Sequence, residues 1–131
     1  MAAEQTRPLS PHLSVWRWGP HMLVSILHRI TGGALTVAGL AVLTWWLLAV
    51  AAGGTAYEDF AAAASHWAGI AVLIGLTWAF FQHLLSGIRH LFMDAGQALE
   101  LGVNKSAAIA TLVVSVILTA ALWAYILGVV K

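Results

Sequence analysis

Two histidines that stand seven residues apart are the strongest chemical signal in the sequence. His83 and His90 lie in FFQHLLSGIRHLFMDAG, and this spacing places them on one face of a helix, about 10 Å apart along its axis. Ser86 and Gly87 lie between them on the same stripe. Because glycine has no side chain, Gly87 would let a flat ligand or a second helix approach the backbone closely.

An imidazole in such an apolar stretch has two possible roles. His83 could ligate haem iron, for which histidine is the usual axial donor. It could equally hydrogen-bond a neighbouring helix, and this histidine alone does not decide between the two. A haem with two histidine ligands would need the second from another chain. His66 lies near the opposite end of the same helix, and His90 cannot reach the far face of the ring.

A second polar group lies in HMLVSILHRI, where His21, Ser25, His28 and Arg29 fall close to one helical face. Arg29 comes just before a long uncharged run, which places it near the membrane interface, where a charge costs little. If a haem is bound, its propionates need cations at this height, and His28, Arg29 and His90 could supply them. The alternative for these three residues is a solvated interfacial role.

The composition indicates that lipid surrounds the elements that carry these residues. Of the 131 residues, 61% are hydrophobic and 8% are charged, whereas a soluble domain would have about 25% charged residues. Uncharged runs cover residues 30–57, 60–88 and 106–130. Each run exceeds the ~20 residues that a helix needs to cross the hydrocarbon layer, and helices satisfy their own backbone groups there.

The sequence therefore predicts an all-α integral membrane protein with three transmembrane helices in a bundle. We expect one domain over residues 1–131, in which a cytoplasmic segment at 1–19 precedes helices at about 20–52, 60–92 and 105–130.

Basic residues set the expected orientation. Five of the six lysines and arginines fall on one side of the predicted spans and only Lys131 on the other. The positive-inside rule then places the N-terminus in the cytoplasm and the C-terminus outside. The absence of cysteine excludes disulfides, thiolate-held iron–sulfur clusters and covalently attached c-type haem. A net charge of +1 gives no indication of a nucleic-acid partner.

Three segments together resemble the cytochrome b subunit of succinate dehydrogenase. They are RPLSPHLSVW at residues 7–16, SILHRITGG at 25–33 and HLLSGIRHLFMDAG at 83–96. Their order, their spacing and the three predicted spans all agree with that family, so the resemblance covers essentially the whole chain.

The resemblance implies roles for individual residues. His83 would be the axial ligand of haem b and so bind its iron, while Ser25 and Arg29 would contact ubiquinone. Arg29 would also serve a haem propionate, with His28 and His90 nearby. Asp94 would help to supply protons to the quinone. The resemblance further places His12 where it would help to dock the soluble subunits.

The resemblance also implies a four-subunit complex in an inner (cytoplasmic) membrane. A flavoprotein subunit would oxidise succinate, an iron–sulfur subunit would carry the electrons, and a second membrane anchor would supply the other haem ligand. This chain would then carry no succinate chemistry of its own. Two alternatives stay open: a fumarate reductase anchor that runs the reaction in reverse, and a haem-free helix bundle that only tethers soluble subunits.

Overall fold

The computed structural model describes residues 17–129 and confirms the prediction of three membrane-spanning helices. The segments Pro20–Ala52, Trp67–Asp94 and Leu101–Val129 are each long and apolar enough to cross a membrane. Within the described residues there is no strand. The elements in chain order are α1 (Pro20–Ala34), the π-helical segment η1 (Leu35–Gly39), α2 (Leu40–Ala52), α3 (Gly54–Ser65), α4 (Trp67–Asp94) and α5 (Leu101–Val129).

The first span is a single rod that contains a short π-helical segment. It begins at Pro20, because proline fits the first helical turn, where no backbone N–H is needed. η1 then follows α1 without a break and leads into α2. α2 ends at Ala52, and the Gly53 that follows has a φ of +65°, a conformation that glycine adopts readily.

The second span begins later than the sequence predicts. We expected one helix over residues 60–92, but the structure places 60–65 in α3 and starts α4 at Trp67. His66 separates them with an extended backbone, and its Nδ1 accepts a hydrogen bond from the Ala68 N–H at 3.3 Å. The alanine-rich end of α3 is as apolar as the span itself, so hydropathy does not reveal this break.

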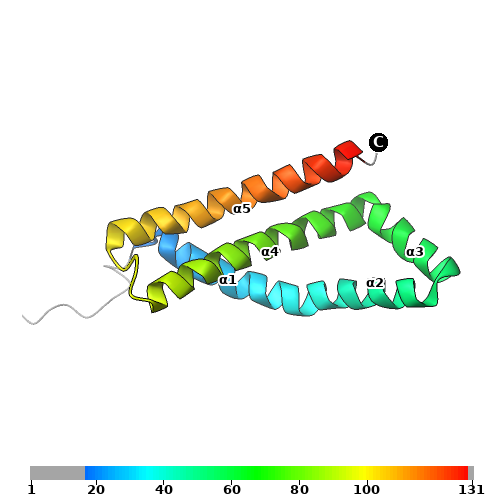
Figure 1. The fold of residues 1–131 in the computed structure, drawn as a ribbon, viewed down its shortest axis with the longest axis horizontal. Helices are drawn as coiled ribbons and strands as arrows, with labels where there is room; N and C mark the ends of the chain where they lie inside the picture. The colour runs from blue at the N-terminus through cyan, green and yellow to red at the C-terminus, as the bar shows by residue number, and fades with distance from the viewer. Residues whose placement is uncertain (1–16, 130–131) are drawn as a thin grey trace, which may run out of the picture.

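The three spans are closely packed at one end and spread apart at the other. α4 packs against both α1 and α5, and these three helices come together at the left-hand end of Figure 1. At the right-hand end α2 and α5 lie apart, and α3 connects α2 to α4. The site described below lies at the closely packed end.

Polar residues are unusually common among the buried ones. The buried apolar side chains are small, apart from Val24, whereas most large hydrophobic residues are exposed. This distribution suits a chain whose outer surface meets lipid or other membrane subunits and whose helices meet through small and polar residues. The buried polar residues are Thr31, Gln82, Ser86, Arg89, Thr111, Ser115 and Thr119.

Candidate functional site

α4 presents polar residues to both of its neighbours at helical spacing. His83, Gly87 and His90 follow one stripe, toward α1. Gln82 and Arg89 belong to the adjacent stripe, and both hydrogen-bond residues of α5. The two stripes begin at neighbouring residues, so a single helix places chemically different groups against two partners.

The His83 imidazole is held by α1 through one nitrogen. Its Nδ1 lies 3.1 Å from the carbonyl oxygen of His28 and 3.3 Å from Oγ1 of Thr31. A carbonyl oxygen only accepts, so Nδ1 carries the hydrogen and donates it. In a neutral ring Nε2 then has a free lone pair, and it has no hydrogen-bond partner among the described residues. This is the arrangement of a metal-ligating histidine, whose second nitrogen donates to an outer group that fixes the ring.

Gly32 makes this close approach of α1 and α4 possible. A Cβ atom at Gly32 would lie 2.9 Å from Cε1 of His83, which is too close for two carbon atoms. The neighbouring Gly33 has open space around it. Of these two adjacent glycines, therefore, only Gly32 is required by the packing.

Three histidines at the closely packed end, His28, His83 and His90, form a layered group. The rings of His28 and His83 are stacked, with centroids 4.0 Å apart and planes 7° from parallel, and the His28 and His90 centroids are 5.2 Å apart. Two rings stacked face to face cannot ligate one iron from opposite sides. Within residues 17–129 no group of three or more histidine or acidic side chains could hold a metal ion. His83 could therefore be at most one of two axial ligands here.

A pocket of about 420 Å³ lies at the closely packed end of the bundle, between α1, α4 and α5. It brings together three of the predicted site residues, Ser25, Arg29 and His90, whereas Asp94 is exposed and does not line it. Among residues 17–129 its lining is His21, Met22, Ser25, Ile26, Arg29, Arg89, His90, Met93 and Asn104.

Arg89 and Asn104 also line the pocket, although the sequence analysis did not assign them to a site. Arg89 counted only toward the membrane orientation, yet its side chain is buried and donates a hydrogen bond to Oδ1 of Asn104. A signal for Arg89 was present in the sequence. Gln82, Ser86 and Arg89 stand at positions i, i+4 and i+7, which marks a polar face on an apolar helix. No such pattern marks Asn104.

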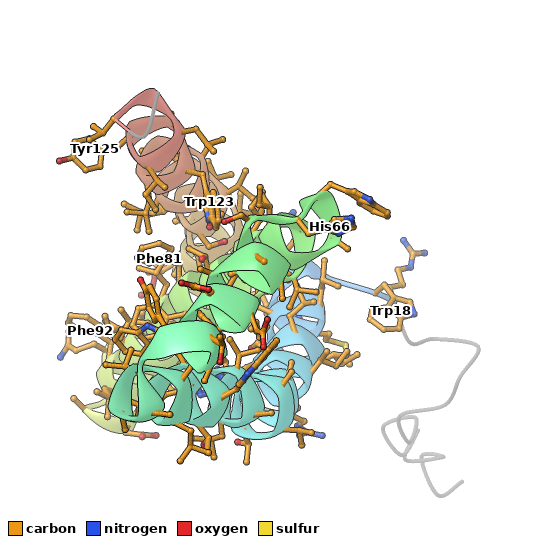
Figure 2. All side chains as sticks on the ribbon, turned by 90° about the vertical axis from the view of Figure 1, so that its right-hand side faces the viewer. Trp18, His66, Phe81, Phe92, Trp123 and Tyr125 are labelled. Carbon is orange, nitrogen blue, oxygen red and sulfur yellow. The ribbon has the colours of Figure 1, made fainter. Side chains whose placement is uncertain are left out.

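Beyond Asn104, the described side-chain hydrogen bonds between α5 and α4 join the two helices. Ser115 Oγ donates to Oε1 of Gln82 at 2.8 Å, and Trp123 Nε1 donates to Oγ1 of Thr77 at 3.3 Å. Figure 2 shows Trp123 turned toward α4, whereas Tyr125 points away from the bundle. These hydrogen bonds link α4 to α5 along most of the span.

His66 is well separated from this group. It precedes α4 at the end away from the pocket, and seventeen residues of helix put it about 25 Å from His83 along the axis. Arg7 and His12 lie outside the described residues.

Comparisons with known proteins identify relatives over most of the chain. Residues 3–122 match the family described as succinate dehydrogenase/fumarate reductase transmembrane subunit. The succinate dehydrogenase cytochrome b556 subunit of Paracoccus denitrificans is 47% identical over 95 residues, which cover 72% of each chain. The b556 subunit of Rickettsia felis is 36% identical over 118 residues, or 89% of this chain and 90% of that one. The mitochondrial b560 subunit of Bos taurus is 34% identical over 117 residues, or 85% and 66%.

Proposed function

The chain belongs to the succinate dehydrogenase/fumarate reductase transmembrane subunit family, and on that premise we propose that it is the anchor of a succinate dehydrogenase that binds haem b and ubiquinone. It is a multi-pass membrane protein. Its function would be to hold these two groups where electrons from an iron–sulfur subunit can reach them. Succinate itself would be oxidised on a flavoprotein subunit.

The geometry of His83 is the observation that carries the haem assignment. The backbone carbonyl of His28 fixes the ring and its tautomer, which leaves Nε2 free to ligate iron. Haem b, when bound, supplies one-electron chemistry. The chain's own part is to orient this nitrogen and to provide groups for the propionates. His28, Arg29 and His90 remain our candidates for that second role, since all three lie at the inner end of the bundle.

The pocket at the inner end supports the quinone assignment. Ser25 and Arg29 lie one helical turn apart on α1 and both line it. A hydroxyl and a guanidinium can donate hydrogen bonds to quinone carbonyls and stabilise the charge that develops on them. The head group would occupy this polar end, while the isoprenoid tail would extend into the hydrocarbon. Asp94 is exposed at the last turn of α4, so we assign it at most the delivery of protons to the edge of the pocket.

The proposed partners are a second membrane anchor, an iron–sulfur subunit and a flavoprotein. The second anchor would supply the other axial ligand and cover part of the exposed apolar surface. We place the complex in the inner membrane with the N-terminus of this chain in the cytoplasm. A reporter fused after Lys131 should then read outside, and one inserted in the α4–α5 connection should read inside. Two reporters on the same side would contradict three spans.

The haem assignment is tested by the absorption spectrum of the assembled complex. His83→Ala should remove or strongly alter the reduced b-type spectrum because one axial nitrogen is lost. His66→Ala is the matched control, since that histidine lies at the far end of α4, and it should leave the spectrum unchanged. An unaltered low-spin spectrum in the His83 variant would reject the ligand. A complex without any Soret band would favour a haem-free tether.

Fumarate reduction is the second candidate, because the family includes fumarate reductase subunits. The number of chains in the purified complex and the type of quinone bound to it would help to separate the two directions.

A further inference from the structure

Arg89 is a buried cation whose hydrogen-bond partner among residues 17–129 is neutral. Its side chain is 7% exposed, although it lies on a helix of a membrane span. The guanidinium donates to the amide oxygen of Asn104, and its Nε has no hydrogen-bond partner among residues 17–129. Arginine stays charged in proteins, so burial without an anion is costly.

The surroundings of Arg89 are suited to an anionic ligand. The pocket it lines also contains Arg29, His21 and His90, and no acidic residue of the described part of the chain lines it. Two guanidinium groups without a carboxylate give this pocket a positive potential that low-dielectric walls would strengthen. The pocket therefore favours ligands with negatively charged oxygen atoms.

A purely structural role for Arg89 explains less. The hydrogen bond to Asn104 joins α4 to the first turn of α5, but a neutral side chain could make the same link without a buried charge. Asn104 is itself held in place, because its Nδ2 contacts Sδ of Met93 at 3.0 Å. Asn104 thus orients one end of the guanidinium and leaves the Nε–H without a partner.

We propose that Arg89 binds a negatively charged oxygen in this pocket and that Asn104 positions it for that role. The inference rests on the proposed function, which supplies two sources of such an oxygen: a quinone oxygen that gains charge during reduction and a haem propionate. Both would meet the same donor, and measurements on the assembled complex distinguish them.

The decisive variant is Asn104→Asp, because the two roles predict opposite results. A carboxylate at this position would pair with Arg89, which would strengthen the link between α4 and α5 but neutralise the pocket. If Arg89 serves a ligand, Asn104→Asp should assemble normally and still bind that ligand more weakly. Asn104→Ala removes the acceptor without adding charge and is the matched control, with a smaller expected effect.

Two substitutions of Arg89 itself test its charge: Arg89→Gln removes it and Arg89→Lys keeps it. Loss of a charge-assisted hydrogen bond should weaken binding about ten-fold or more, and lysine should restore part of it because it keeps the charge. For a quinone partner, KM for ubiquinone rises while the haem midpoint potential stays constant. For a propionate partner, the midpoint potential falls, because a nearby positive charge favours the reduced haem.

The proposal is overturned if Asn104→Asp keeps the wild-type KM and midpoint potential. It is also overturned if Arg89→Gln changes both quantities no more than Asn104→Ala does. Parallel assays of Ser25→Ala and Arg29→Ala show whether a negative result concerns Arg89 alone or the proposed quinone site as a whole. A defect in those two variants with no defect at Arg89 would remove only Arg89 from the site.

Discussion

On the side of α4 that faces α1, His83 leaves one ring nitrogen available to a ligand, whereas on the side that faces α5 Gln82 and Arg89 form hydrogen bonds to the neighbouring helix. His83 donates from Nδ1 to α1 and leaves Nε2 without a partner among the described residues. Gln82, the preceding residue, is fully buried and accepts from Ser115 of α5. Adjacent residues of one helix therefore differ in role: His83 leaves a ring nitrogen available on one side, and Gln82 joins two helices on the other.

The difference between the two sides shows how polar groups can be used at membrane depth. Lipid gives little hydrophobic driving force for helix association, so small residues and hydrogen bonds contribute to holding helices together. A polar side chain in a span must then either pair with a neighbour or meet a ligand. Arg89 belongs to the α5-facing stripe and also lines the pocket. It therefore pairs with a neighbouring helix and at the same time borders a space that a ligand could fill.

The largest expected effect comes from breaking the α1-facing side at Gly32. Gly32→Val would place a branched side chain where even a Cβ atom is too close to the His83 ring. The ring must shift from the His28 carbonyl, and we expect the assembled complex to lose most of its haem. The haem-to-protein ratio of the purified complex measures this.

Gly33→Val is the control for that prediction, because the two changes are chemically identical and one residue apart. A Cβ atom added at Gly33 would meet no other atom within 4 Å, so this variant should retain its haem. Equal haem loss in both variants would show that the helix tolerates no bulk here, and the close packing against His83 would not be the cause.

An intermediate effect is expected at the pocket. Arg29→Ala should slow succinate-to-ubiquinone electron transfer by about ten-fold or more, and Ser25→Ala by roughly five-fold. The effects differ because Arg29 would donate a charged hydrogen bond to the quinone and Ser25 a neutral one. Succinate oxidation by a dye that takes electrons from the soluble subunits should survive. Equal loss with both acceptors would indicate faulty assembly, and full quinone activity in both variants would exclude these residues from the site.

The sequence predicts the α1-facing side better than the α5-facing side. The uncharged runs and the seven-residue spacing of His83 and His90 predict the spans and one helical face, because helical geometry alone places these residues. The pairing of His83 with the His28 carbonyl depends on how α1 packs against α4, which periodicity does not specify. Ser25, Arg29 and His90 meet in one pocket as their heights in the membrane indicate.

Helical spacing and position along the span did not predict that Arg89 and Asn104 line the pocket. A positive residue near the end of a span most often lies in the interface, and only the three-dimensional packing shows that Arg89 is buried against α5. The start of α4 was missed for a similar reason, since the break at His66 depends on a local cap and not on hydropathy. Features that require a specific partner are those that the sequence left open.

The smallest expected effect concerns the α5-facing side, at the hydrogen bond between Ser115 and Gln82. Both side chains are fully buried, and buried polar pairs in membranes contribute only about 0.6 kcal/mol on average. Ser115→Ala leaves the Gln82 amide oxygen unpaired. Gln82→Leu leaves Ser115 bonded to the Leu112 carbonyl at 2.9 Å and removes an amide nitrogen that has no partner among the described residues.

We therefore expect Ser115→Ala to destabilise the detergent-solubilised complex more than Gln82→Leu does, with both effects small. Thermal dissociation measures the order, and the double variant gives the coupling between the two residues. Ser106→Ala is the control, because the Ser106 hydroxyl is exposed and bonds only within α5, to the Gly102 carbonyl. The haem spectrum should be unchanged in all of these variants. A changed spectrum would mean that the two sides of α4 are not independent, since a group that only joins α4 to α5 has no reason to affect a ligand held on the opposite side.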